Sequence, residues 1–192
     1  VSTLGFDETD ADKVAADARV AVCEGEKSAD ALATVAGGAA KPCRFISMPS
    51  QLDLPGLTCG RMPQTEEECL ADALLYSEAD LGKKVVLTEE NDEDTLEDFS
   101  RREFTIVGIT KSVLYINYER GSTSVGSGTI SSFVYVLPEA FTTDYDTALY
   151  LRLADREGEV YSSEYTACID AAEPWVKQLA EDTARARTDR IY

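Results

Sequence analysis

Residues 60–141 alternate between turn signals and short apolar runs, and this order constrains the fold more than any other feature of the chain. A Gly-Arg-Met-Pro turn at 60–63 is followed by a short element of 69–71 with 74–75 that is predicted to be buried, and by a turn that enters a strand at 81–87. Residues 104–109 are apolar on both faces, which is typical of a strand buried on both sides. Together these segments predict a β-rich unit.

Two further segments of this region predict a long hairpin. Residues 113–118 and 129–137 are rich in aromatic and β-branched side chains, and a Gly/Ser-rich stretch at 121–128 joins them. We expect this stretch to be a flexible hairpin tip, or a tip that touches a partner or substrate. The strongly acidic residues 89–94 show no apolar period, and they predict a solvated loop.

The segments on either side of this region predict helices and strands in a segregated order. Thr9 and Asp12 form a capping pattern for a helix that runs to about residue 18. Strands are expected at 19–24, 29–35 and 43–48. Because helices and strands are grouped along the chain instead of alternating, the predicted fold class is α+β.

The C-terminal part predicts one strand and one long helix. Residues 149–153 alternate between leucine and polar or aromatic side chains, as in a strand with one buried face. Apolar residues then recur every three or four positions to the end of the chain and define one face of a helix. They are Tyr165, Ile169, Ala172, Val176 and Leu179. Pro174 predicts a kink or break of this helix near 170–174.

The charge of the chain excludes one class of partner. There are 36 Asp and Glu residues against 18 Lys and Arg, a formal net charge of −18. Because nucleic-acid-binding proteins need a basic surface, no nucleic-acid partner is expected. Repulsion between such acidic chains predicts a monomer at low salt, which light scattering would test. No apolar run approaches the roughly 18 residues that span a bilayer, and no segment resembles a signal peptide.

The sequence offers no recognisable catalytic motif. Histidine is absent, which removes the commonest general base and zinc ligand together with the Ser-His and Cys-His nucleophile pairs. Asp92 and Asp94 resemble the start of a calcium loop, but Glu97 occupies the position that needs glycine. The 121–128 stretch lacks the Gly-Lys-Ser/Thr ending of a phosphate loop. We therefore expect no enzyme and no cofactor and nominate no catalytic, cofactor-binding or metal-binding residue; a carboxylate-dependent hydrolase is the catalytic alternative.

The cysteines are odd in number, so at least one must be unpaired within a monomer. They lie at Cys23, Cys43, Cys59, Cys69 and Cys168. Most are expected to be small buried residues, and a single disulfide is the alternative.

Three groups of residues in the chain follow one another in a distinctive order. They are 60–63 with Glu67, Glu68 and Cys69; then 81–84 leading to 104–108; and finally 115–121 leading to 133–136. These groups resemble the extracytoplasmic, MacB-like periplasmic core domain of bacterial FtsX-like ABC transporter permeases. The third group is more similar to a Gram-positive branch than to the MacB exporters, so an efflux partnership of the MacB kind is not carried over.

The resemblance implies a domain organisation and a set of partners. A split α/β porter-like subdomain at 1–55 plus 142–192 would be interrupted by a β-rich sabre-like insert at 56–141. The domain would lie outside the cytoplasm, tethered at both ends to transmembrane segments, and a cytoplasmic ATP-binding subunit would drive it through them. Its substrate is unknown, and a permease dimer is compatible with the family.

Two points stay open from the residues alone. Arg185, Arg187 and Arg190 give the last helix a basic end, which fits either ordinary helix C-terminal placement or a stalk approaching an anionic membrane surface. The alternative function is a secreted or surface-anchored ligand-binding or adhesion domain with no transporter attached. Apolar segments flanking the chain and a neighbouring ATPase gene would separate the two functions.

Overall fold

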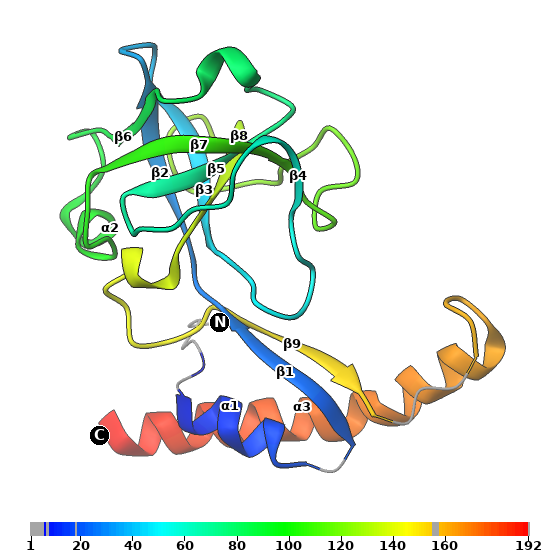
Figure 1. Ribbon diagram of the computed structural model, residues 1–192. Coiled ribbons are helices and arrows are strands. Elements are labelled where there is room, and N and C mark those ends of the chain that lie inside the picture. Colours follow the sequence, from blue (N-terminus) through cyan, green and yellow to red (C-terminus); the bar gives the residue numbers. More distant parts are fainter. Residues whose placement is uncertain (1–5, 7, 18, 155–157, 192) are drawn as a thin grey trace. The chain divides into compact units, whose positions relative to one another are not determined.

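The structure, a computed structural model that describes residues 6, 8–17, 19–154 and 158–191, divides into two compact units (Figure 1). Unit 1 combines the two ends of the chain, Val1–Gly25 and Tyr145–Tyr192, and unit 2 is Glu26–Asp144. Unit 2 is therefore an insertion within unit 1. The mixture of a β-rich unit with a few helices confirms the predicted α+β class.

The observed division differs from the predicted boundaries at 55/56 and 141/142. Two strands expected in the terminal unit belong to unit 2: β2 (Ser28–Val35) and β3 (Lys41–Ser47). They pair with each other, and β2 also pairs with β6 (Lys84–Leu87). Backbone pairing with strands far along the chain thus decides where the division falls.

In its described residues, unit 1 contains two helices and two strands. They are α1 (Glu8–Ala15), β1 (Val20–Glu26), β9 (Ala148–Leu153) and α3 (Ser163–Ile191). β1 and β9 pair as a two-stranded sheet. Thr9 lies inside α1, so its predicted capping role is wrong. α3 continues through Pro174, so the predicted break is wrong, while the alternative of a kink stays a prediction.

α3 meets the strands of unit 1 through a face that differs slightly from the predicted one. Ile169 is 41% exposed, whereas Ala172 is buried. The guanidinium of Arg19 lies 4.1 Å from the ring centroid of Trp175, the only tryptophan in the chain. Such a cation–π contact joins the start of β1 to α3. A small cavity of about 150 Å³ lies beside this contact, between Leu153 of β9 and α3.

Seven strands form the sheet of unit 2 in the part of the chain that the structure describes. They are β2, β3, β4 (Gly56–Gly60), β5 (Glu68–Asp72), β6, β7 (Glu103–Lys111) and β8 (Ser132–Val136). Their order is β4-β7-β5-β8-β3-β2-β6, and β6 also pairs with β7. This last pairing closes the sheet on itself. β4 stays outside the closure, because it pairs with the second half of β7 while β6 pairs with the first half.

The predicted hairpin between 113–118 and 129–137 is wrong. β8 lies parallel to β3 on one side and antiparallel to β5 on the other. Because both edges of β8 are occupied, no strand can form beside it from 113–118, and residues 112–131 become a long connection without strands. All five residues of β8 are buried.

Two apolar clusters fill unit 2. The larger one includes Phe45, Phe99, Phe104 and Phe141, with ring centroids 5.0 Å apart for Phe45 and Phe99 and 5.4 Å apart for Phe99 and Phe141. The second contains Ile46, Leu70, Phe133 and Tyr135. Burial of such side chains is the main stabilising contribution. None of the helices in the described part of the chain combines the length and apolar character that a membrane crossing requires.

Short helices occupy connections of unit 2. They are η1 (Glu78–Asp80), α2 (Glu93–Glu97) and η2 (Pro138–Ala140). α2 corrects the prediction that 89–94 is entirely loop, because the Asp92 side chain accepts a hydrogen bond of 2.7 Å from the Thr95 amide and caps the helix. The acidic residues at its start are also favoured there by the helix dipole.

The conspicuous 60–63 turn is joined to the start of β5 by an ion pair. Gly60 has a φ of +78°, which favours glycine, and Arg61 Nη1 donates to Glu68 Oε2 over 2.7 Å. The Gln64 amide donates to the same oxygen over 2.8 Å. The motif therefore has a structural role, since it fixes the path of the chain from β4 to β5.

This ion pair predicts a titration. The hydrogen bond from Arg61, helped by that from the Gln64 amide, lowers the pKa of Glu68 to about 2. Because the folded pKa lies below the ordinary value, the pair stabilises the fold above that ordinary pKa and is lost as pH falls toward 2. An NMR titration should find the Glu68 carboxyl still charged where ordinary glutamates are protonated. In Arg61→Met the pKa should return toward its ordinary value; an unchanged pKa would contradict the assignment.

Candidate partner-binding surface

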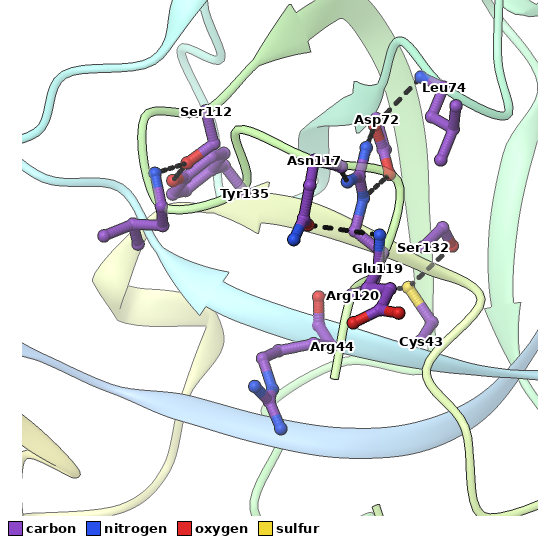
Figure 2. A network of polar contacts seen from close by, with 11 residues as sticks. Cys43, Arg44, Asp72, Leu74, Ser112, Asn117, Glu119, Arg120, Ser132 and Tyr135 are labelled. Carbon is purple, nitrogen blue, oxygen red and sulfur yellow. Dashed lines mark hydrogen bonds and ion pairs between the residues drawn. The ribbon is translucent and has the colours of Figure 1, made fainter. Parts of the chain in front are cut away.

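A buried ion pair holds the long connection between β7 and β8 against the end of β5 (Figure 2). Arg120 donates through Nε to Asp72 Oδ2 over 2.7 Å and through Nη2 to Asp72 Oδ1 over 2.9 Å. The side chains are 7% and 2% exposed. The Leu74 amide also donates to Asp72 Oδ1, and Arg120 Nη1 donates to the Asn117 carbonyl. This two-point pairing fixes both position and orientation of the connection.

Aromatic side chains also support this connection. Tyr115 stacks on Phe133 of β8 with ring centroids 4.9 Å apart, and the Arg120 guanidinium lies 5.3 and 5.4 Å from these two rings. The hydroxyls of Ser112 and Tyr135 are 2.7 Å apart and share a buried hydrogen bond. The connection is thus attached to β8 at Ser112 and Tyr115, and to β5 at Arg120.

A second arginine extends this polar network toward β2. Arg44 of β3 donates to both carboxylate oxygens of Asp30 on β2, over 2.7 and 2.9 Å, and these residues are direct cross-strand partners. Hydrogen bonding to Asp30 raises the pKa of Arg44, which therefore stays charged. Burial raises the pKa of the Tyr115 hydroxyl, although hydrogen bonding to Arg44 opposes this shift. Tyr115 therefore stays neutral at physiological pH.

The segment that these contacts hold presents large apolar side chains to solvent. Ile116 is 92% exposed and Tyr118 is 84% exposed, while Leu74 on the turn after β5 is 45% exposed. They border a groove of about 480 Å³ whose base includes Asp72 and Arg120. Exposed aliphatic and aromatic groups on a firmly held segment are typical of protein interaction sites. The groove is therefore the candidate functional surface of unit 2.

The exposure of Leu74 corrects the prediction that 69–75 is buried throughout. Residues 68–72 form β5 and the chain then turns, with the amides of Leu75 and Tyr76 donating to the Asp72 carbonyl. Leu75 is 41% exposed. The turn places the leucines outside the sheet, where Leu74 lines the groove.

The Gly/Ser stretch 121–128 folds back on itself and on unit 2. The Thr123 amide donates to the Gly128 carbonyl over 3.2 Å, and Ser122 bridges Thr129. A side chain at Gly126 would meet Leu32 Cδ2 at 2.8 Å and Pro42 Cγ at 3.2 Å. The stretch therefore forms a small antiparallel turn of its own, with Gly126 against β2 and β3, and it does not join two strands of the sheet as predicted. None of its residues lines the groove described above.

The remaining sequence candidates are the cysteines, the acidic clusters and the C-terminal arginines. None of the five cysteines, all of which lie among the described residues, forms a disulfide, and burial raises the pKa of Cys43 to about 12 and raises that of Cys69 as well. Among the described residues, no three His, Cys, Asp or Glu side chains lie close enough to hold a metal ion. The side chains of Arg187 and Arg190 lie outside the described residues.

Comparison with known proteins places this fold in one structural class. No model of a known protein family matches the sequence, and no curated protein matches it. Among solved structures, the periplasmic region of MacB from Actinobacillus actinomycetemcomitans superimposes with a TM-score of 0.51 at 12% identity, over 91% of this chain and 74% of that one. The fold is thus that of a MacB-like periplasmic domain, as the sequence groups at 60–69, 81–108 and 115–136 indicated.

Two further structures agree with this placement. The extracellular domain of the noncanonical ABC-type transporter YknZ from Gram-positive bacteria has a TM-score of 0.52 at 11% identity, over 81% of this chain and 76% of that one. A domain of a permease protein from Porphyromonas gingivalis has a TM-score of 0.50 at 13% identity, over 80% and 71% of the two chains. The chain is therefore structurally similar to extracellular domains of ABC-type transporter permeases.

Proposed function

We propose that this chain is the extracytoplasmic domain of an FtsX-like ABC transporter permease, and that it relays ATP-driven motion to a substrate or partner outside the cytoplasm. The proposal is carried by one observation. Unit 2 is inserted between β1 and β9, two paired strands of the unit that also holds α1 and α3. The helices nearest both ends of the chain thus belong to one unit, and the candidate binding surface belongs to the other.

The chain connections suit the transmission of movement. The chain leaves unit 1 after β1 and returns shortly before β9, so both connections arise from a single strand pair. On the side of unit 2, Lys27 Nζ donates to the Thr143 carbonyl and ties the outgoing segment to the returning one. In unit 1, the Phe6 amide donates to the Asp146 carbonyl over 2.7 Å. A displacement of the terminal helices would therefore reach unit 2 through two linked connections instead of one.

The proposed role requires partners and no catalytic centre in this chain. A cytoplasmic ATP-binding subunit would supply the energy through transmembrane segments at the ends of the domain, as in transporters of this class. The absence of histidine supports a non-enzymatic role, because the commonest general base is missing from the whole sequence. The purified chain alone is expected to hydrolyse no ATP in a phosphate-release assay.

The relay is tested by distance measurements in the complete transporter. Spin labels carried by non-natural amino acids at Asp170 of α3 and Glu90 of unit 2, both exposed, avoid the five native thiols. In lipid nanodiscs with the ATP-binding subunit, the distance distribution should change between the nucleotide-free and vanadate-trapped states. A matched pair within unit 2, at Glu90 and Ser127, should not change. Identical Asp170–Glu90 distributions in all nucleotide states would refute the relay.

A further inference from the structure

Unit 2 has one strand whose outer edge is open. In the described residues β4 pairs with β7 alone, whereas every other strand of the closed sheet of unit 2 pairs with at least two neighbours. Four of the five residues of β4 are exposed. An unpaired edge presents backbone N–H and C=O groups that another extended chain can satisfy.

The sequence of β4 leaves this edge accessible. Gly56–Gly60 contains no proline and no charged residue, two devices that commonly protect edge strands. The strand is short, and a bulge at Thr58 interrupts its register with β7. Apolar side chains in and beside the strand are nevertheless accessible to a ligand. Leu54, Leu57 and Met62 are 54%, 42% and 42% exposed.

The groove lies at the end of the sheet where β4 begins and where β5 and β7 end. Lys111, the last residue of β7, pairs with Gly56 at the start of β4 and also lines the groove. The Thr110 hydroxyl donates to the Gly56 carbonyl over 3.1 Å and fixes this junction. Beyond it lie Leu74 and Ile116, held in place by the Asp72–Arg120 pair. A chain that runs along the outer edge of β4 past Gly56 would have to cross the end of β7 at Lys111 to reach this apolar surface.

We propose that β4 and the adjoining groove bind an extended peptide segment of a partner protein, which adds a strand to the sheet beside Gly56–Gly60 and places apolar side chains against Leu74 and Ile116. The backbone edge dictates the conformation of the ligand, because only an extended chain matches the repeat of its donors and acceptors. The groove dictates its composition, since apolar side chains are needed to cover Leu74, Ile116 and Tyr118. A second copy of this chain is disfavoured by its net charge of −18. This inference concerns partner recognition and holds independently of the ATP-driven relay.

The experiment uses short random peptides displayed on phage and selected against the purified chain. Selected sequences are synthesised with a fluorescent label, and their dissociation constants are measured by fluorescence anisotropy. Two lysine substitutions at exposed positions are compared: Thr58→Lys on the open edge, and Ser127→Lys in the packed Gly/Ser stretch as the matched control. Thermal unfolding establishes that both variants fold like the parent chain.

Selected peptides should be rich in alternating apolar residues, and Thr58→Lys should weaken their binding by about tenfold or more. Ser127→Lys should leave the dissociation constant unchanged within roughly twofold, as for a surface substitution away from the site. Ile116→Ser should also weaken binding, and N-methylation of alternate peptide amides should abolish it, because strand addition needs those donors. NMR should locate the largest amide shifts at Gly56–Gly60.

Three outcomes would overturn the proposal. One is that no extended apolar peptide is selected. Another is that selected peptides bind the Thr58→Lys variant as tightly as the parent chain. The third is that sedimentation shows a concentration-dependent dimer that Thr58→Lys disrupts, because the edge would then serve self-association. Each result is independent of nucleotide-driven distance changes in the transporter, so the relay and the peptide site can fail separately.

Discussion

Replacement of Arg120 by methionine is expected to lower the free energy of unfolding by about 3–5 kcal/mol. The substitution leaves the Asp72 carboxylate at 2% exposure without its charged partner, with only the Leu74 amide still donating to it. A buried charge without a counter-ion is costly, because the protein interior solvates a charge much less well than water does. The connection that carries Ile116 and Tyr118 also loses its attachment to β5. Urea unfolding followed by circular dichroism measures the change.

Two controls separate the two contributions to this loss of stability: the cost of leaving one charge buried, and the loss of packing by the arginine side chain. The double variant Asp72→Leu with Arg120→Met should recover most of the lost stability, because neither charge remains buried. Arg61→Met removes one partner of a solvent-screened pair whose arginine is 49% exposed, so it should destabilise the fold far less than Arg120→Met. If Arg120→Met were no more destabilising than Arg61→Met, the buried pair would not be what holds the connection.

Much of the secondary structure of this chain could be predicted because it is encoded locally. The run of apolar residues in 104–109 becomes β7, and the alternating 149–153 becomes β9. The repeat of apolar residues beyond 163 becomes α3. β7 is recognised by an apolar run without a period, whereas β9 and α3 are recognised by periods of two and of three to four residues, and these signals are visible without knowing the partner.

The pairing of the strands could not be predicted in the same way. Residues 113–118 have the aromatic and β-branched composition of a strand but remain a connection, since β3 and β5 already occupy both edges of β8. The parallel pairing of Cys43 with Ser132 joins residues far apart in sequence. Local composition reports a tendency to be extended, whereas competition for an edge is decided by the whole sheet.

The candidate surface shows the same limit. Asp72 directly follows the apolar run 69–71, and an acid at the end of a buried strand signals that a partner is needed. The sequence does not reveal which of the 18 Lys and Arg residues supplies it. The path of the connection between β7 and β8 brings Arg120 to Asp72, although Arg120 stands next to Gly121 in a stretch whose sequence predicted a hairpin. The path of the connection also decides that Ile116 and Tyr118 are exposed, so from the sequence alone these apolar and aromatic residues could be interpreted as core residues.

Replacement of Gly60 by alanine is expected to lower the free energy of unfolding by about 4 kcal/mol. Gly60 has a φ of +78°, and a Cβ there would lie 2.8 Å from the Gly108 Cα and closer still to the Val107 carbonyl oxygen. Both contacts are backbone atoms of β7, which cannot move aside without breaking the pairing of β4 with β7. The substitution combines the conformational penalty of the left-handed region with a direct steric overlap.

Gly82 provides the matched control, because it has a φ of +82° but no atom within 4 Å of the place where an alanine methyl would lie. Gly82→Ala should therefore show the conformational penalty alone, about 1–2 kcal/mol. Urea unfolding of both variants under identical conditions gives the difference directly, and that difference measures how tightly the 60–63 turn is packed against β7. If both variants lost the same free energy of unfolding, the turn would be able to relax away from β7. Glycine at position 60 would then be needed for its backbone geometry and not for the close contact between the strands.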